Sequence, residues 1–127
     1  MKENYREIFQ IQANLDIPTL NKWGRMHHYA RHKNDTAHQE AFGYLINPHK
    51  SKYLIQVFEI EVYSNRNDDV DNSVIVAKNF VDALRKSGMV LNDTRKYYRG
   101  CYLGIDNTLP KKHFRIVVKG IYTEINK

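Results

Sequence analysis

Hydrophobic and polar residues alternate near the start of the chain. From Phe9 to Ile17, every second residue is apolar and the residues between are polar. This two-residue period is typical of a half-buried strand. Pro18 closes the pattern, because proline cannot donate a hydrogen bond to a β-ladder. We therefore predict a strand over Phe9–Ile17.

The next segment, from Thr19 to Asn34, is polar, basic and aromatic, which favours a loop. Thr36 and Gln39 then have the spacing of a capping box, in which each side chain bonds the backbone of the other. This spacing predicts a helix that begins near Thr36. The helix should end before Pro48, since proline interrupts helical hydrogen bonding.

A second helix is predicted over Ser73–Lys86. Asn72 is the expected N-cap, and Gly88 is a natural C-terminal stop because glycine readily adopts the left-handed conformation. The apolar residues with helical spacing, which we expect to face the core, are Val74, Ala77, Val81 and Leu84.

Three further strands are predicted over Tyr53–Tyr63, Tyr98–Ile105 and Phe114–Thr123. In the first of them the inward residues are expected to be Phe58, Ile60 and Val62, and the outward residues Glu59 and Glu61. The order of elements predicts an α+β fold with a small mixed sheet of about four strands and two main helices. The length of 127 residues suits a single domain over 1–127.

An acidic turn, Asn67–Asn72, separates a predicted strand from a predicted helix. Asp69 and Asp71 are two residues apart there, so both can face one point. Carboxylates are the ligands that hard cations such as Mg²⁺ prefer. A solvated, helix-capping turn is the alternative, and Asp68 is interpreted as a solvated neighbour. An EF-hand loop is excluded, because its sixth position would be glycine and its twelfth glutamate.

The chain is basic, with 20 lysines and arginines against 14 acids and a net charge of +6. Basic residues cluster in 22–33 and in 85–99, which predicts an anionic partner, most simply nucleic acid. A generic basic surface is the alternative. As a group, phosphate contacts predict steep salt dependence of binding. The candidate contacts are Lys22, Arg25, Arg31, Lys33, Arg66, Arg95 and Lys96.

Other side chains add fewer constraints. His28 and His32 have a helical metal-ligand spacing, but zinc needs further ligands, so a surface or DNA-facing role is favoured. Cys101 is the single cysteine, which excludes an internal disulfide and suits a reducing, cytoplasmic compartment. We see no leader pattern and no apolar run of bilayer length. Four aromatic residues among the basic ones either stack on unpaired bases or pack in the fold: Trp23, Tyr29, Tyr97 and Tyr98.

Several motifs occur in a familiar order. The loop of 17–23 carries Pro18 and Asn21, Asp69-Val70-Asp71-Asn72 forms a D-x-D-N motif, and Lys78 precedes Asp82-Ala83-Leu84, Gly88 and Asp93. This ordered set resembles the RusA-type endodeoxyribonucleases, which resolve Holliday junctions and are common in bacteria and their phages. The resemblance runs from about residue 11 to residue 118.

The resemblance implies a homodimer that uses Mg²⁺ or Mn²⁺ to nick paired strands of four-way DNA junctions in recombination and repair. Asp69, Asp71 and Asp93 would be the catalytic metal ligands. Lys78 would position water or stabilise charge, and Asn21 would contact DNA.

Two departures from the family pattern keep alternatives open. Lys78 follows Asn72 by six residues rather than three, and Asn92 stands where the family often has an acid. The alternatives are a catalytically degenerate DNA-binding module of the same family and a small basic RNA-binding protein.

Overall fold

A computed structural model describes residues 5–15 and 28–125, without the side chains of His28, Tyr29 and Arg31. Its elements confirm an α+β fold with a four-stranded mixed sheet and two main helices. They run in the order β1 (Arg6–Asn14), α2 (His28–Ile46), the short 3₁₀ helix η2 (Asn47–His49), β2 (Tyr53–Ser64), α3 (Val70–Ser87), β3 (Tyr98–Ile105) and β4 (His113–Glu124).

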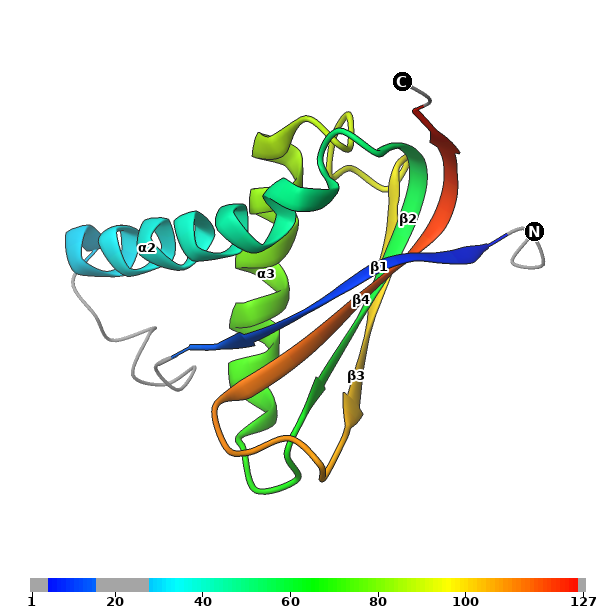
Figure 1. Ribbon diagram of the computed structural model, residues 1–127. Coiled ribbons are helices and arrows are strands. Elements are labelled where there is room, and N and C mark those ends of the chain that lie inside the picture. The colour runs from blue at the N-terminus through cyan, green and yellow to red at the C-terminus, as the bar shows by residue number, and fades with distance from the viewer. Residues whose placement is uncertain (1–4, 16–27, 126–127) are drawn as a thin grey trace.

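The strand order across the sheet is β1-β4-β2-β3. β4 pairs antiparallel with both β1 and β2, whereas β3 runs parallel to β2. A parallel pair needs a long crossover, and α3 supplies it between β2 and β3. Both helices lie on one side of the sheet and cross each other there (Figure 1). Within the described ranges, no helix is long and apolar enough to cross a membrane.

The hydrophobic core lies between the helices and one face of the sheet. Phe42 of α2 and Phe80 of α3 meet edge to face with ring centroids 5.5 Å apart. Both rings are fully buried, as are Phe58 of β2 and Phe114 of β4. These large side chains tie each helix to the central strands, so the ends of α3 are fixed relative to the sheet.

The predicted strands are confirmed, with small differences at their ends. The alternation in β1 is confirmed as far as Leu15, which is buried, and the strand begins earlier, at Arg6. The strand ends at Asn14, before the predicted end at Ile17, which itself lies outside the described residues. In β2, Phe58, Ile60 and Val62 are buried as predicted.

The predicted start of the first helix is wrong. α2 begins at His28, so residues 28–34 belong to the helix rather than to a loop. Thr36 lies inside α2, where its hydroxyl donates to the carbonyl of His32 over 2.9 Å. The predicted end before Pro48 is confirmed, because α2 stops at Ile46 and Pro48 lies in η2.

α3 also differs from the prediction at its start. Its N-cap is Asp69 rather than Asn72, and the helix extends one turn further toward the acidic turn. Val74, predicted to face the core, is 47% exposed. The stop at Gly88 is confirmed: this residue has φ of 82°, and its N–H bonds the carbonyl of Arg85.

Candidate functional site

Asp69 and Asp71 meet at the N-terminus of α3. Asp69 has an extended backbone, and its carboxylate accepts a hydrogen bond from the N–H of Asp71 over 3.1 Å. A capping side chain of this kind satisfies one of the helix's unpaired N–H groups. The positive end of the helix dipole lies at the same point and favours anions. The local geometry of the helix start therefore holds the Asp69 carboxylate in place and puts Asp71 in the same first turn of the helix.

The acidic turn is anchored to the connection between β3 and β4. The Asn65 side chain donates to the carbonyl of Leu109 over 2.9 Å. The carboxylate of Asp68 accepts from the backbone N–H of Lys112 over 3.0 Å. Asp68, which we interpreted as a solvated neighbour, thus has a structural contact. These two bonds join the segment before α3 to the connection between β3 and β4, and so hold the start of α3 at this end of the sheet.

Asn72, the last residue of the D-x-D-N motif, has a buried side-chain oxygen with no hydrogen-bond partner among the described residues. An unsatisfied buried acceptor costs about 1–3 kcal/mol, so such atoms commonly bond a water or an ion. Next to it, the hydroxyls of Ser64 and Ser73 lie 3.3 Å apart in a buried pair. The start of α3 therefore combines two carboxylates with one unpaired amide oxygen.

Asp93 lies outside α3, in the connection between this helix and β3. Its carboxylate is 3.9 Å from the Nε atom of Arg85, near the C-terminal end of the helix. Arg85 is 14 residues beyond Asp71, about 21 Å along the helix axis. Over the described residues, no three carboxylate, imidazole or thiol groups gather where a metal ion could be held. Asp69 and Asp71 thus share the first turn of α3, and Asp93 does not form a three-acid group with them.

Lys78 occupies the middle of α3 and contacts acids of both helices. Its Nζ atom is 3.6 Å from a carboxylate oxygen of Asp35 and 3.5 Å from one of Asp82. Lys78 and Asp82 also line a hollow of about 200 Å³ with Asp93 and Tyr98. The helix is continuous, so Lys78 lies about 10 Å beyond Asp71 along the axis. Lys78 therefore shares a hollow with Asp93, and its ion pairs are with Asp35 and Asp82 rather than with Asp69 or Asp71.

A polar network between α2 and α3 was not predicted. Fully buried Asn79 donates to Asp35 over 3.2 Å and accepts from Gln39 over the same distance. Gln39 also donates to Asp82. The apolar spacing of α3 gave no sign of this, because Asn79 lies on a face that otherwise buries hydrocarbon. The network sets the helix crossing by directional hydrogen bonds as well as by shape.

The predicted DNA contacts are distributed over several surfaces. Asn21, Lys22 and Arg25 lie outside the described residues, as does the side chain of Arg31. The exposed ones are Lys33 on α2, Arg66 in the acidic turn, and Arg95 and Lys96 in the connection before β3. Lys96 lies 5.4 Å from the centre of the Tyr97 ring, a cation–π contact at the surface.

The two carboxylates at the start of α3 suit a hard divalent cation. Mg²⁺ is often held by one or two carboxylates while it keeps several waters. Asp69 has a second carboxylate oxygen beyond the one that caps the helix, and Asp71 adds another carboxylate. The unpaired oxygen of Asn72 lies one residue further along. These groups fit Mg²⁺ or Mn²⁺ without Asp93.

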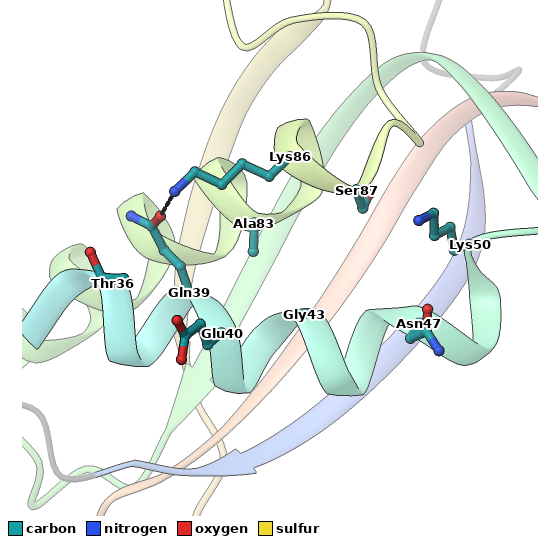
Figure 2. Close-up of a pocket in the computed structure, with 9 residues that line it drawn as sticks. All are labelled: Thr36, Gln39, Glu40, Gly43, Asn47, Lys50, Ala83, Lys86 and Ser87. Atoms are coloured by element: carbon teal, nitrogen blue, oxygen red, sulfur yellow. Dashed lines mark hydrogen bonds between the residues drawn. The ribbon is translucent and has the colours of Figure 1, made fainter.

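A separate groove of about 320 Å³ lies between α2 and α3 (Figure 2). Lys86 reaches across it from α3 and donates to the side chain of Gln39. Gly43 and Ala83 leave room because their side chains are small or absent. The groove is lined by amides, lysines and one acid, and it lies away from the carboxylate pair.

No protein-family model and no curated protein matches the sequence.

Proposed function

We propose that this chain is a metal-dependent, structure-selective DNA endonuclease of the RusA type, which resolves four-way junctions by paired nicking. The observation that carries the proposal is the carboxylate pair of Asp69 and Asp71 at the N-terminus of α3. On a chain of net charge +6 that would bind phosphates, two neighbouring carboxylates repel the phosphate backbone unless a cation lies between them. A metal-dependent hydrolase that acts on this backbone would place a cation there.

In this proposal, Asp69 and Asp71 hold Mg²⁺ or Mn²⁺ through their carboxylates. The bound ion would supply an activated water and offset charge on the scissile phosphate. The N-terminus of α3 adds a positive potential at the same point. Exposed Arg66 lies in the same turn, where it can contact the DNA backbone. Asp93 and Lys78 belong to a second, neighbouring hollow on α3 and are tested separately.

A homodimer is part of the proposal, because a four-way junction has two-fold symmetry and two sites are needed for paired nicks. The cell compartment that fits DNA recombination is the bacterial cytoplasm, for a chromosomal or a phage gene alike. These points follow from the resemblance and from the substrate's symmetry.

The test is cleavage of a synthetic four-way junction with Mg²⁺, with Mn²⁺ and with EDTA. Asp71→Asn should abolish cleavage while it keeps or tightens junction binding, because it removes a metal ligand and also a repulsion with phosphate. Glu40→Gln is the matched control, since it removes an exposed carboxylate of α2. Full cleavage by purified Asp71→Asn would refute the assigned site.

One observation favours a second candidate, a DNA-binding module of the same family without catalysis. Lys78 is engaged by Asp35 and Asp82, and Asp93 pairs with Arg85 rather than joining the carboxylate pair. This candidate expects salt-sensitive junction binding with no nicks under any metal. Competition by duplex RNA would point instead to an RNA-binding protein.

A further inference from the structure

The face of the sheet opposite the helices carries an ordered set of aromatic and charged side chains. Among the described elements no helix covers this face (Figure 1). Side chains of β2, β3 and β4 that point away from the core meet there, because residues paired across strands share a face. Tyr63 pairs with Arg115 on one side and with Gly104 on the other. Tyr102 lies opposite Glu61.

Tyr63 and Tyr102 form the aromatic part of this surface. Their ring centroids are 6.1 Å apart and their planes are inclined by 62°. Both rings lie close to Gly104: a Cβ atom at this residue would be 2.6 Å from the Tyr63 ring and 2.8 Å from the Tyr102 ring. Glycine therefore lets both rings approach the backbone. Tyr102 nevertheless remains 60% exposed, so it offers its ring to solvent.

Arg115 is held in place on the same surface. Its guanidinium carbon is 4.4 Å from the centre of the Tyr63 ring, and its Nη2 atom is 3.2 Å from a carboxylate oxygen of Asp106. The Thr108 side chain and backbone bond the carboxylate of Asp106 and, with Arg115, lower its pKa. The cation is thus stacked and oriented before any ligand binds.

Lys119 is held by Glu61 in a similar way, with Nζ 2.8 Å from the carboxylate. Burial alone would raise the pKa of Glu61, but hydrogen bonds from Lys119 and Tyr63 outweigh it and lower the pKa. Glu61 is therefore an anion whose charge is offset locally. A phosphate near Arg115 would meet little net repulsion from it.

A hollow of about 390 Å³ adjoins Tyr102 between β2 and β3. It lies where the pairing of the two strands shifts register, between Phe58 and Ile60, and where Gly100 has φ of 141°. Arg99 and the carboxylates of Glu59 and Glu61 are among its lining groups. A side-chain ring, a guanidinium and acceptor oxygens thus surround one open space.

We propose that this open sheet face binds unpaired nucleotides of single-stranded DNA. One base stacks on Tyr102 beside the hollow, and the neighbouring phosphates lie toward Arg99 and Arg115. Exposed aromatic rings flanked by cations are the means by which sheet surfaces hold single strands. The net charge of +6 is a property of the whole chain, and it favours a polyanionic partner over a cationic peptide.

The carboxylates of the hollow indicate which bases fit. Glu61 already accepts hydrogen bonds from Tyr63 and Lys119, but each carboxylate oxygen has a second lone pair. The carboxylates of the hollow can therefore accept a further hydrogen bond from an exocyclic amino group, as carboxylates do from the N4 amine of cytosine. Thymine has no exocyclic amino group, and the carbonyl oxygen at the same position only accepts hydrogen bonds, so it makes none with a carboxylate. The platform should therefore prefer cytosine to thymine. It shares the DNA partner of the proposed function, but it requires neither metal nor cleavage.

The experiment measures binding of fluorescein-labelled oligo(dC) and oligo(dT), about twenty nucleotides long, by anisotropy in EDTA at low salt. Tyr102→Ala should weaken oligo(dC) binding about tenfold, the loss expected from one stacked base, whereas Tyr102→Phe should stay near wild type. Tyr44→Ala is the control, because Tyr44 is 83% exposed on α2. Binding of a duplex of the same length should not change in any variant.

Wild-type affinity for oligo(dC) in Tyr102→Ala would overturn the platform, as would equal weakening by Tyr44→Ala. Equal binding of oligo(dC) and oligo(dT) would overturn the cytosine preference and the base position beside Glu59. Parallel loss of duplex binding in Tyr102→Ala would mean that the ring supports the fold, which also refutes the proposal. Junction cleavage tests the proposed metal site of Asp69 and Asp71, whereas oligonucleotide binding in EDTA tests Tyr102. The endonuclease proposal and the single-strand proposal can therefore fail independently.

Discussion

Asp69 combines two roles that a set of substitutions can separate. Its carboxylate caps α3 through the 3.1 Å bond from the N–H of Asp71, and it also forms half of the proposed metal site. Asparagine caps a helix about as well as aspartate but lacks the charge, whereas alanine does neither. Asp69→Asn and Asp69→Ala therefore differ in stability but not in the ability to hold a cation.

The expected magnitudes follow from the contacts of Asp69. Loss of an N-cap costs about 1 kcal/mol, within a range of about 0.5–2 kcal/mol. The charge itself gains about 0.3–1 kcal/mol from the helix dipole, but Asp68 and Asp71 repel it and offset most of that gain. We expect Asp69→Asn within about 0.5 kcal/mol of wild type and Asp69→Ala lower by about 1–1.5 kcal/mol. For a domain of this size the second change lowers Tm by about 3–6 °C.

Urea unfolding and thermal melting without metal, followed by circular dichroism, compare the stabilities of the two variants and wild type. The melts are then repeated with Mg²⁺ at about ten times its dissociation constant, where binding should add about 1.4 kcal/mol to the free energy of unfolding of wild type. Neither variant should gain this stabilisation, and both should lose junction cleavage. Equal stability of the two variants would refute the capping argument. A full Mg²⁺ shift in Asp69→Asn would refute the metal site.

Three further changes test the fold and the charged face. Gly120→Ala should lower the urea midpoint strongly, by about 3 kcal/mol or more, because the new Cβ would lie 2.0 Å from the carbonyl oxygen of Val57. Phe80→Ala should cost about 3–5 kcal/mol in the same assay, since the ring is fully buried against α2, and a smaller loss would mean that the core collapses around it. The pKa of Glu61 is lowered in the fold by the hydrogen bond from Lys119, so its contribution is present above its ordinary pKa of 4.5 and is lost as pH falls through the lower folded value. Glu61→Gln should therefore reduce the loss of stability below pH 4.5, by less than about 1 kcal/mol for such a partly exposed pair, and an unchanged pH profile would contradict this.

The strands could be predicted because they bury every second residue, which gives the sequence a two-residue hydrophobic period. Phe58, Ile60 and Val62 face the core at every second position, and no distant contact is needed to see the pattern. The start of α2 could not be predicted in this way. Buried Asp35 is held by Asn79 of α3, 44 residues away, so a polar residue on the inner face hid the helical period.

The candidate site could be predicted only in part, because local spacing places some of its residues and distant contacts place the others. The closeness of Asp69 and Asp71 follows from their two-residue spacing at a helix start, which is a local property. The place of Asp93 depends on the length of α3 and on the ion pair with Arg85, which no spacing in the sequence reveals. The surface of Tyr63 and Tyr102 was missed because it joins strands that are far apart in sequence.

The position of β4 in the sheet has a consequence for the order of folding. β4 follows the other strands in sequence, yet it lies between β1 and β2 and pairs with both along most of its length. Until His113–Glu124 has been synthesised, β1 lacks its sheet partner and β2 has an open edge. A nascent chain halted before β4 would expose both edges to other chains, which favours aggregation. The sheet is therefore completed only after His113–Glu124 has left the ribosomal exit tunnel, and chaperone binding before that point should protect β1 and β2.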